Sequence, residues 1–267
     1  SRRLLTGFGG PTSGVAFSPD GRLAAGAGGL FSETENVIRI WDVASGEELT
    51  VLMPEADLHK QALQFTTDNH LLSSGQDGLR RWNVETGESE LLYGGMVRAF
   101  SASSDGRRVL LVKIADEKWA EEGGRALVFD LETGVATPLE THGDRVWAVA
   151  LDKTGAIAAT GDEDGSIRVG PVTGEEPHLL LGHEDTIYSL AFDPLGRWIA
   201  SGANDSTARL WPMPDLSKPP LHTLPREELI AKLKTLTNLR VVRDADSATG
   251  WKLTHDPFPG WETVPTW

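Results

Sequence analysis

Short apolar stretches alternate with turn-forming residues along most of this chain, and the clearest example is the segment from residue 187 to residue 211. Residues 187–192 and 198–201 are rich in residues that favour β-strands, and residues 207–211 alternate small or polar side chains with apolar ones. The segments between them, 193–196 and 204–206, contain the Asp, Pro, Gly, Asn and Ser residues that are typical of tight turns. The pattern predicts three short strands in an antiparallel meander.

The same unit repeats along the chain at a nearly constant period. The third predicted strand of each copy ends at Trp41, Trp82, Phe129, Gly170 and Trp211, which lie 41, 47, 41 and 41 residues apart. A period of about 40–45 residues is typical of propeller blades, each of which is a small four-stranded sheet. The sequence therefore predicts an all-β fold with five copies, at about residues 13–53, 58–93, 94–140, 141–181 and 182–224.

The fifth copy resembles a WD40 repeat. Its Gly182-His183 pair, its Ser201-Gly202 pair, Asp205 and Trp211 stand where that family has Gly-His, Ser-Gly, the turn Asp and the Trp of its Trp-Asp pair. In the family, the His, Ser, Asp and Trp form a hydrogen-bonded tetrad within one blade, which gives each buried polar group a partner. The resemblance therefore implies a structural tetrad of His183, Ser201, Asp205 and Trp211.

The fourth copy matches the same pattern less completely. His142, Thr160 and Asp164 take the positions of His, Ser and Asp, and Gly170 takes that of Trp. The resemblance implies a WD40-type β-propeller with five recognisable blades. Two architectures stay open: a composite sixth blade built by the C-terminal hairpin and residues 2–5, or a fragment of a seven-bladed ring. A fragment would expose an apolar blade face and should aggregate or pair with an upstream propeller segment.

The period ends near residue 225, and we expect residues 1–225 to form the propeller. Residues 225–236 carry the acidic start and apolar stripe of a short helix. Residues 238–243 and 250–254 predict a pair of strands, and the chain ends in a segment rich in Pro and Trp. We expect residues 226–267 to pack on the propeller or to close it.

This tail is itself similar to a known pattern. Residues 236–242, 247–252 and 257–261 resemble the C-terminal end of large bacterial WD40 proteins, in which the propeller often follows a serine/threonine kinase or a STAND-type NTPase module. The resemblance implies that the chain is the C-terminal sensor part of a larger bacterial signalling protein.

Composition and charge narrow the classes of partner. The net charge is −14, and a general nucleic-acid binder needs a basic face instead. No apolar run approaches the roughly 18 residues of a membrane span, so membrane insertion is not expected. The chain has no Cys, which excludes disulfides and favours a reducing compartment, here taken as the cytoplasm.

The motifs of common enzymes are missing from the sequence. It holds no G-x-x-x-x-G-K phosphate loop, no G-x-S-x-G nucleophile motif and no H-R-D or D-F-G of kinases. Residues 162–165 have the acidic start of a calcium loop, but the later ligands of an EF-hand do not follow, and a blade turn explains these residues better. We therefore expect no catalytic residue, cofactor or metal, and a protein that is not an enzyme.

The WD40 resemblance also indicates where a partner would bind. In that family the second residue of each innermost strand lies on the top rim, and here those residues are Ser13, Gln61, Arg98, Trp147 and Tyr188. The residues before the turn Asp add Gln76, Glu163 and Asn204. Trp, Tyr and Arg are enriched at binding hot spots, so Arg98, Trp147 and Tyr188 would form one contiguous patch. The alternative is partial burial in the wall of the central channel.

These observations favour a non-catalytic protein-interaction or sensing module, a scaffold that binds a protein or peptide on its top face. A structural or self-associating module, or a fragment that assembles with missing blades, is the alternative. An enzyme that uses the central channel is the third reading, and the scarcity of clustered carboxylate or His motifs argues against it.

Overall fold

We describe a computed structural model of the chain, which describes residues 4–28, 36–53, 60–114, 124–143, 145–236, 240–243 and 251–254. The chain divides into two compact units, Ser1–Leu216 and Ser217–Trp267, and each is described by itself. The predicted all-β architecture is confirmed, because the first unit consists of five antiparallel sheets of three or four strands, consistent with WD40 propeller blades.

Each sheet is a meander in which consecutive strands pair, and we number the blades in chain order. Blade 1 contains β1 (Thr12–Phe17), β2 (Leu23–Gly28), β3 (Ile38–Asp42) and β4 (Glu48–Leu52). Blade 2 contains β5 (Lys60–Phe65), β6 (His70–Gly75), β7 (Gly78–Asn83) and β8 (Ser89–Gly94). Blade 3 contains β9 (Val97–Ala102), β10 (Arg108–Lys113), β11 (Arg125–Asp130) and β12 (Ala136–Pro138).

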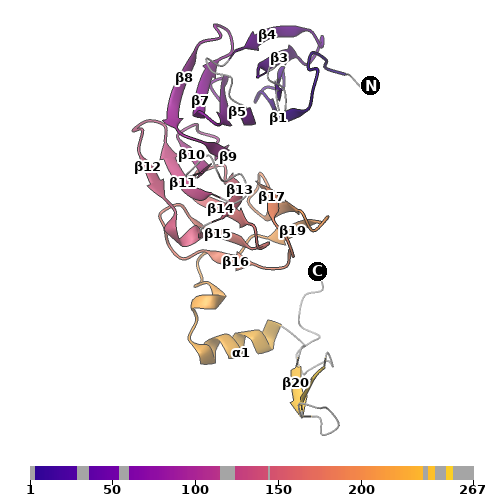
Figure 1. Ribbon diagram of the computed structural model, residues 1–267. Coiled ribbons are helices and arrows are strands. Elements are labelled where there is room, and N and C mark those ends of the chain that lie inside the picture. The colour runs from indigo at the N-terminus through magenta and orange to yellow at the C-terminus, as the bar shows by residue number, and fades with distance from the viewer. Residues whose placement is uncertain are drawn as a thin grey trace. The chain divides into compact units, whose positions relative to one another are not determined.

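Blades 4 and 5 complete the first unit. Blade 4 follows a 3₁₀ turn (Glu140–His142) and contains β13 (Val146–Leu151), β14 (Ile157–Asp162), β15 (Ile167–Pro171) and β16 (His178–Leu180). Blade 5 contains β17 (Ile187–Phe192), β18 (Trp198–Ala203) and β19 (Ala208–Pro212), and among the described residues it has no fourth strand. Figure 1 shows the five sheets following one another around an arc, from indigo β1 to orange β19.

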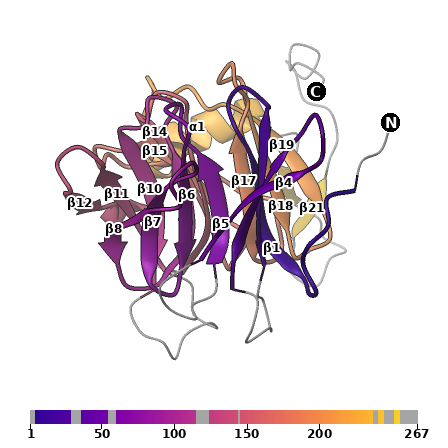
Figure 2. The same cartoon turned by 90° about the horizontal axis from the view of Figure 1, so that it is seen from above.

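The innermost strands hold the arc together. β1 packs beside β5, β5 beside β9, β9 beside β13, and β13 beside β17. Because the strands within a sheet alternate in direction, the described turns of the first unit lie at two opposite edges of the sheets, as Figure 2 shows. We call the edge at which the innermost strands begin the top face.

Four apolar cores lie between consecutive blades. Their alternation is clearest in β6, where Leu71 packs in the core shared with blade 1 and Leu72 in the core shared with blade 3. In β10 the same alternation places Leu111 toward blade 2 and Leu110 toward blade 4. A strand that is buried on both faces reads as a continuous apolar run, which explains the sequence VLLV in the middle of β10.

The two terminal sheets are each covered on one face. On β1 of blade 1, Val15 is 74% exposed and Phe17 is 67% exposed, whereas Ala16 packs toward blade 2. On β19 of blade 5, Leu210 is 71% exposed while Trp211 packs against the core shared with blade 4. Moreover, the innermost strands of consecutive blades pack side by side, but β17 of the last blade does not pack along β1 of the first. Both ends of the arc therefore present apolar side chains to solvent.

The second unit contains a short 3₁₀ turn (Leu221–Thr223), the helix α1 (Arg226–Leu236) and a hairpin of β20 (Arg240–Arg243) and β21 (Trp251–Thr254). The helix and the strand pair lie where the sequence predicted them, with shorter strands. In the hairpin, Val241 pairs with Leu253 and Arg243 with Trp251. The Pro- and Trp-rich segment from residue 255 onward lies outside the described residues.

Candidate functional site

The five rim residues that the family resemblance indicated share one backbone feature. Ser13, Gln61, Arg98, Trp147 and Tyr188 each occupy a β-bulge at the second residue of an innermost strand, where the pairing skips them. A bulge re-aims the extra side chain and is common beside functional sites. The fold therefore repeats one re-aimed position in every blade, and the residue type at that position decides what the top face presents.

Three of these residues touch one another, and we call Arg98, Trp147 and Tyr188 the aromatic cluster. The guanidinium carbon of Arg98 lies 3.9 Å from the centroid of the Trp147 ring, which is the geometry of a cation–π contact. The Tyr188 ring meets the Trp147 ring edge to face, with centroids 5.7 Å apart. Blades 3, 4 and 5 thus bring together residues that are 90 positions apart in sequence, from 98 to 188.

The cluster is graded from buried to exposed. Arg98 and Trp147 are half-buried, and 56% of Tyr188 is exposed. Burial lowers the pKa of the Arg98 guanidinium, and the neighbouring Tyr188 partly opposes this shift. The Trp147 indole nitrogen is buried and has no hydrogen-bond partner among the described residues. The cluster therefore combines a contiguous patch with partial burial. Arg98 and Trp147 are its half-buried members, and Tyr188 is its solvent-exposed member.

The remaining rim residues differ in what they offer. Ser13 turns back to its own blade, since its hydroxyl donates to the Ala27 carbonyl at 3.4 Å. The backbone of Gln61 lies in β5, but its side chain is outside the described residues. Gln76 is exposed at the end of blade 2. Glu163 forms an ion pair with Arg145, and Asn204 donates to the Asp185 carboxylate at 2.7 Å.

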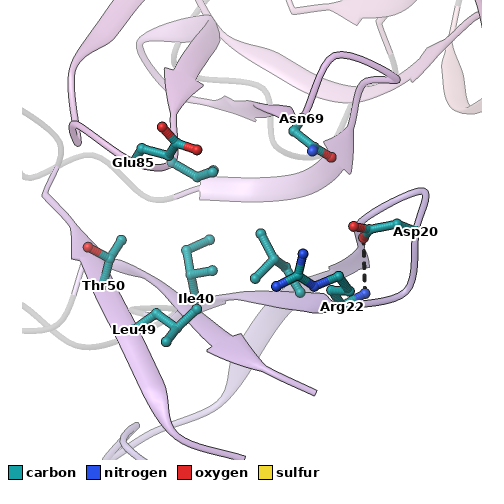
Figure 3. Close-up of a pocket in the computed structure, with 9 residues that line it drawn as sticks. Asp20, Arg22, Ile40, Leu49, Thr50, Asn69 and Glu85 are labelled. Carbon is teal, nitrogen blue, oxygen red and sulfur yellow. Dashed lines mark hydrogen bonds between the residues drawn. The ribbon is translucent and has the colours of Figure 1, made fainter. Parts of the chain in front are cut away.

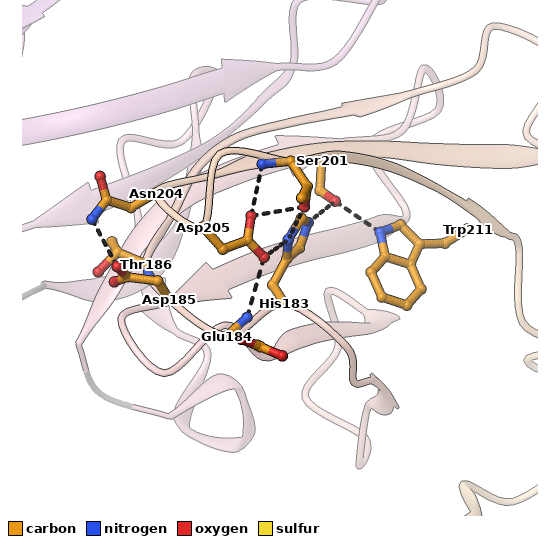
Figure 4. A network of polar contacts seen from close by, with 9 residues as sticks. His183, Glu184, Asp185, Thr186, Ser201, Asn204, Asp205 and Trp211 are labelled. Carbon is orange, nitrogen blue, oxygen red and sulfur yellow. Dashed lines mark hydrogen bonds and ion pairs between the residues drawn. The ribbon is translucent and has the colours of Figure 1, made fainter.

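The tetrad residues of blade 5 form one hydrogen-bonded network, drawn in Figure 4. His183 lies between Asp205 and Ser201, with Nδ1 2.7 Å from the Asp205 carboxylate and Nε2 2.7 Å from the Ser201 hydroxyl oxygen. The Trp211 indole donates to the same Ser201 oxygen at 2.8 Å. Asp205 also accepts from the backbone N–H of Glu184 at 3.2 Å, which ties the loop before β17 to the β18–β19 turn.

The electrostatics of this network follow from its donors. A carboxylate can only accept, so Nδ1 of His183 carries the proton, and in the neutral ring Nε2 accepts from the Ser201 hydroxyl. Hydrogen bonds from Thr207, His183 and Glu184 outweigh the desolvation of Asp205 and hold the pKa of its carboxyl far below the usual range. The charged form of Asp205 is thereby favoured, and its hydrogen bonds to backbone N–H groups join the loop before β17 to the β18–β19 turn.

Blade 4 does not form the tetrad that its sequence suggested, and this corrects the assignment of Asp164. The imidazole ring of His142 bonds to the Thr160 hydroxyl through Nδ1 at 3.0 Å, and its Nε2 has no hydrogen-bond partner among the described residues. Asp162, rather than Asp164, takes the structural role: it pairs with Arg168 at 2.5 Å and accepts from backbone N–H groups of the β14–β15 turn. Gly170 leaves the space of the missing Trp, and Pro177 packs against it.

Blades 1 and 2 have contacts at the positions of the tetrad that are apolar in blade 1 and only partly hydrogen-bonded in blade 2. In blade 2 the Trp82 indole donates to Ser73 at 2.8 Å, and no His of the described residues bonds to this hydroxyl. In blade 1, Phe8 takes the place of the His and meets Trp41 edge to face at 5.8 Å. In the sequence these contacts are indicated by the aromatic residue near the end of the third strand, Trp41 in blade 1 and Trp82 in blade 2.

A cavity that sequence reasoning did not single out lies between blades 1 and 2, away from the top face (Figure 3). It measures about 370 Å³ and is lined by Asp20, Arg22, Leu23, Ile40, Leu49, Thr50, Asn69, Val84 and Glu85. Its Asp20 carboxylate is already engaged by the Ser18 hydroxyl and the Arg22 backbone N–H. No group of three or more His, Asp or Glu that could hold a metal ion occurs in the described part of the chain.

Comparison with known proteins agrees with the geometry. The family model for the WD domain, G-beta repeat matches residues 2–42, 134–169 and 174–212, so these three segments are similar to WD40 repeats. The unmatched residues 43–133 include blade 2 and the first three strands of blade 3, which belong to four-stranded meanders of the same order. In the described residues, no helix has the length and apolar character needed to span a bilayer.

Two curated plant proteins are similar over part of the chain. One is the small ribosomal subunit protein RACK1 of Brassica napus, which is 35% identical over 86 residues, or 32% of this chain and 24% of that protein. The other is the small ribosomal subunit protein RACK1z of Arabidopsis thaliana, 34% identical over 86 residues with the same coverage. The chain thus spans about a quarter of the length of these relatives.

Proposed function

We propose that this chain is a non-catalytic protein-interaction or sensing module that binds a protein or peptide on its top face through the aromatic cluster. The observation that carries the proposal is the contact of Arg98, Trp147 and Tyr188 at equivalent bulges of three successive blades. A preformed stack loses little side-chain freedom when a partner binds, and its exposed Tyr188 supplies apolar area with a polar tip. We place Ser13, Gln61, Gln76, Glu163 and Asn204 on the same rim as further contacts for the partner. The loops of Glu163 and Asn204 are joined through Thr186, which donates its hydroxyl to the Glu163 carbonyl and accepts from the Asn204 backbone N–H.

The biological setting is a further part of the proposal. We place the module in the cytoplasm, as the C-terminal sensor or scaffold of a larger bacterial signalling protein, on the resemblance of its tail. The ribosomal role in the names of the plant relatives is not carried over, because the shared segment covers 24% of their length.

Peptide selection tests the binding function directly. Random dodecapeptides displayed on phage are selected on the immobilised full chain, and the recovered peptides are measured by fluorescence anisotropy. We expect Tyr188→Ala and Trp147→Ala each to weaken binding by about tenfold or more, the range of a hot-spot truncation. Leu195→Ala is the control, because Leu195 is an exposed side chain in the β17–β18 turn at the opposite edge. Equal binding by all three variants would refute the proposal.

The terminal sheets favour a second candidate function, self-association or pairing with further propeller blades. Val15 and Phe17 on blade 1 and Leu210 on blade 5 form apolar faces that soluble monomers rarely leave open. We expect light scattering to give a mass above the 28.9 kDa of one chain, and Phe17→Asp to reduce it. A monomer for both proteins at all concentrations would exclude this function.

A further inference from the structure

The carboxylates around the aromatic cluster are not all neutralised by the chain itself. Blades 4 and 5 place six of them on the top face: Asp162, Glu163, Asp164, Glu184, Asp185 and Asp205. Asp162 is paired with Arg168, Glu163 with Arg145, and Asp205 is held by the tetrad. The loops that carry them are joined, since the Thr186 hydroxyl donates to the Glu163 carbonyl at 3.3 Å and Asn204 donates to Asp185.

The other three carboxylates, Asp164, Glu184 and Asp185, have no cationic partner among the described residues. Asp164 and Glu184 are exposed, and Asp185 is half-buried. The partners of Asp185 are neutral: the Thr186 backbone N–H and the Asn204 amide, each at 2.7 Å. These hydrogen bonds, that of Thr186 first, lower the pKa of the Asp185 carboxyl, so the group stays charged.

The aromatic cluster shows how a cation fits beside these carboxylates. Arg98 covers one face of the Trp147 ring, so a cation of the chain itself already occupies the cation–π position on Trp147. Tyr188 touches Trp147 edge to face and leaves more than half of its surface to solvent. Tyr188 is the second residue of β17, which follows the loop that carries Glu184 and Asp185. A cationic side chain over Tyr188 would therefore meet both a π-face and uncompensated negative charge.

We infer that the partner of the top face is a basic protein segment, with a Lys or Arg side chain placed on Tyr188 and paired with Asp185, Glu184 or Asp164. The inference rests on the proposed function and adds the chemistry of the partner. Arg98 does not reverse it, because its single charge is half-buried against Trp147 and is outnumbered by the three unpaired carboxylates. An acidic partner bound to Arg98 is the rival outcome.

The test uses the same dodecapeptide selection on the full chain and reads the composition of the recovered peptides. We expect enrichment in Lys and Arg, and binding that weakens by about tenfold or more between about 0.05 and 0.5 M NaCl. The combined variant Asp164→Asn, Glu184→Gln, Asp185→Asn should lose about tenfold in affinity, from three partly exposed ion pairs. The matched control Glu47→Gln, Glu85→Gln, Glu88→Gln removes the same charge from exposed turns at the opposite edge and should bind like the unmodified chain.

The outcomes separate the two proposals. Peptides that need Tyr188 but are acidic or neutral, or that bind the charge-reduced top face unchanged, would overturn the basic partner and leave the proposed function intact. Peptides whose binding does not respond to Tyr188→Ala or Trp147→Ala would overturn both. Equal losses in the two triple variants would assign the effect to net charge and would also overturn the inference.

Discussion

The hydroxyl of Ser201 connects His183 and Trp211 in the blade 5 tetrad. Ser201→Ala is therefore the sharpest test of how much the tetrad contributes to the free energy of unfolding. The Ser201 side chain is buried, and its oxygen lies 2.7 Å from Nε2 of His183 and 2.8 Å from Nε1 of Trp211. Alanine removes the oxygen with little change in shape. Both ring nitrogens then lose their partner in a place that water does not reach freely.

The expected loss follows from the number of hydrogen bonds removed. A buried polar group left without a partner costs about 1–3 kcal/mol, so Ser201→Ala should lower the free energy of unfolding by about 2–4 kcal/mol. Ser73 in blade 2 accepts one hydrogen bond, from Trp82, and Ser73→Ala should cost about 1–2 kcal/mol. Ser74 is equally buried, but its hydroxyl has no partner among the described residues, so Ser74→Ala removes an unsatisfied group and should raise the free energy of unfolding by about 1 kcal/mol.

Guanidinium denaturation followed by circular dichroism gives the three values from the shift of the midpoint at constant slope. The order Ser201, Ser73, Ser74 is the result that the hydrogen-bond count requires. If Ser74→Ala destabilises the chain as much as Ser201→Ala, the loss comes from packing of the hydroxyl and not from the tetrad. The reasoning would then be wrong for this fold.

Two further predictions address buried positions elsewhere. Burial and the nearby Arg168 lower the pKa of His142 to about 4, so the folded state disfavours protonation of this ring. The free energy of unfolding should therefore fall by about 3 kcal/mol as the pH drops from about 6.5 to about 4. Urea midpoints across this range should show that part of the slope disappear in His142→Phe, while the loss from carboxylates with lowered pKa remains below about pH 4. Gly78 has a φ of +129°, and a Cβ there would lie 1.9 Å from the Tyr93 carbonyl oxygen, so Gly78→Ala should cost about 3 kcal/mol or more. Gly21, with a φ of +72° and open space around it, is the control, and Gly21→Ala should cost about 1 kcal/mol when both variants are compared by their urea midpoints.

Much of the architecture was readable from the sequence because its signals are local. A spacing of 41, 47, 41 and 41 residues between strand ends shows a repeated unit, and turn residues divide each unit into short strands. The WD40 resemblance placed the second residue of each innermost strand on the top rim, and it predicted one contiguous patch of Arg98, Trp147 and Tyr188.

Only the tertiary structure decided how the copies differ. Gly170 stands where other blades have an aromatic residue, and Pro177 packs against it. His142 bonds to Thr160 without the Asp partner that His183 has in blade 5, and Asp162 pairs with Arg168. The covered and open faces of the blades, and the carboxylates that lack a cation, depend on which side chains meet across sheets. Such contacts join residues that are distant in sequence, so no local pattern encodes them.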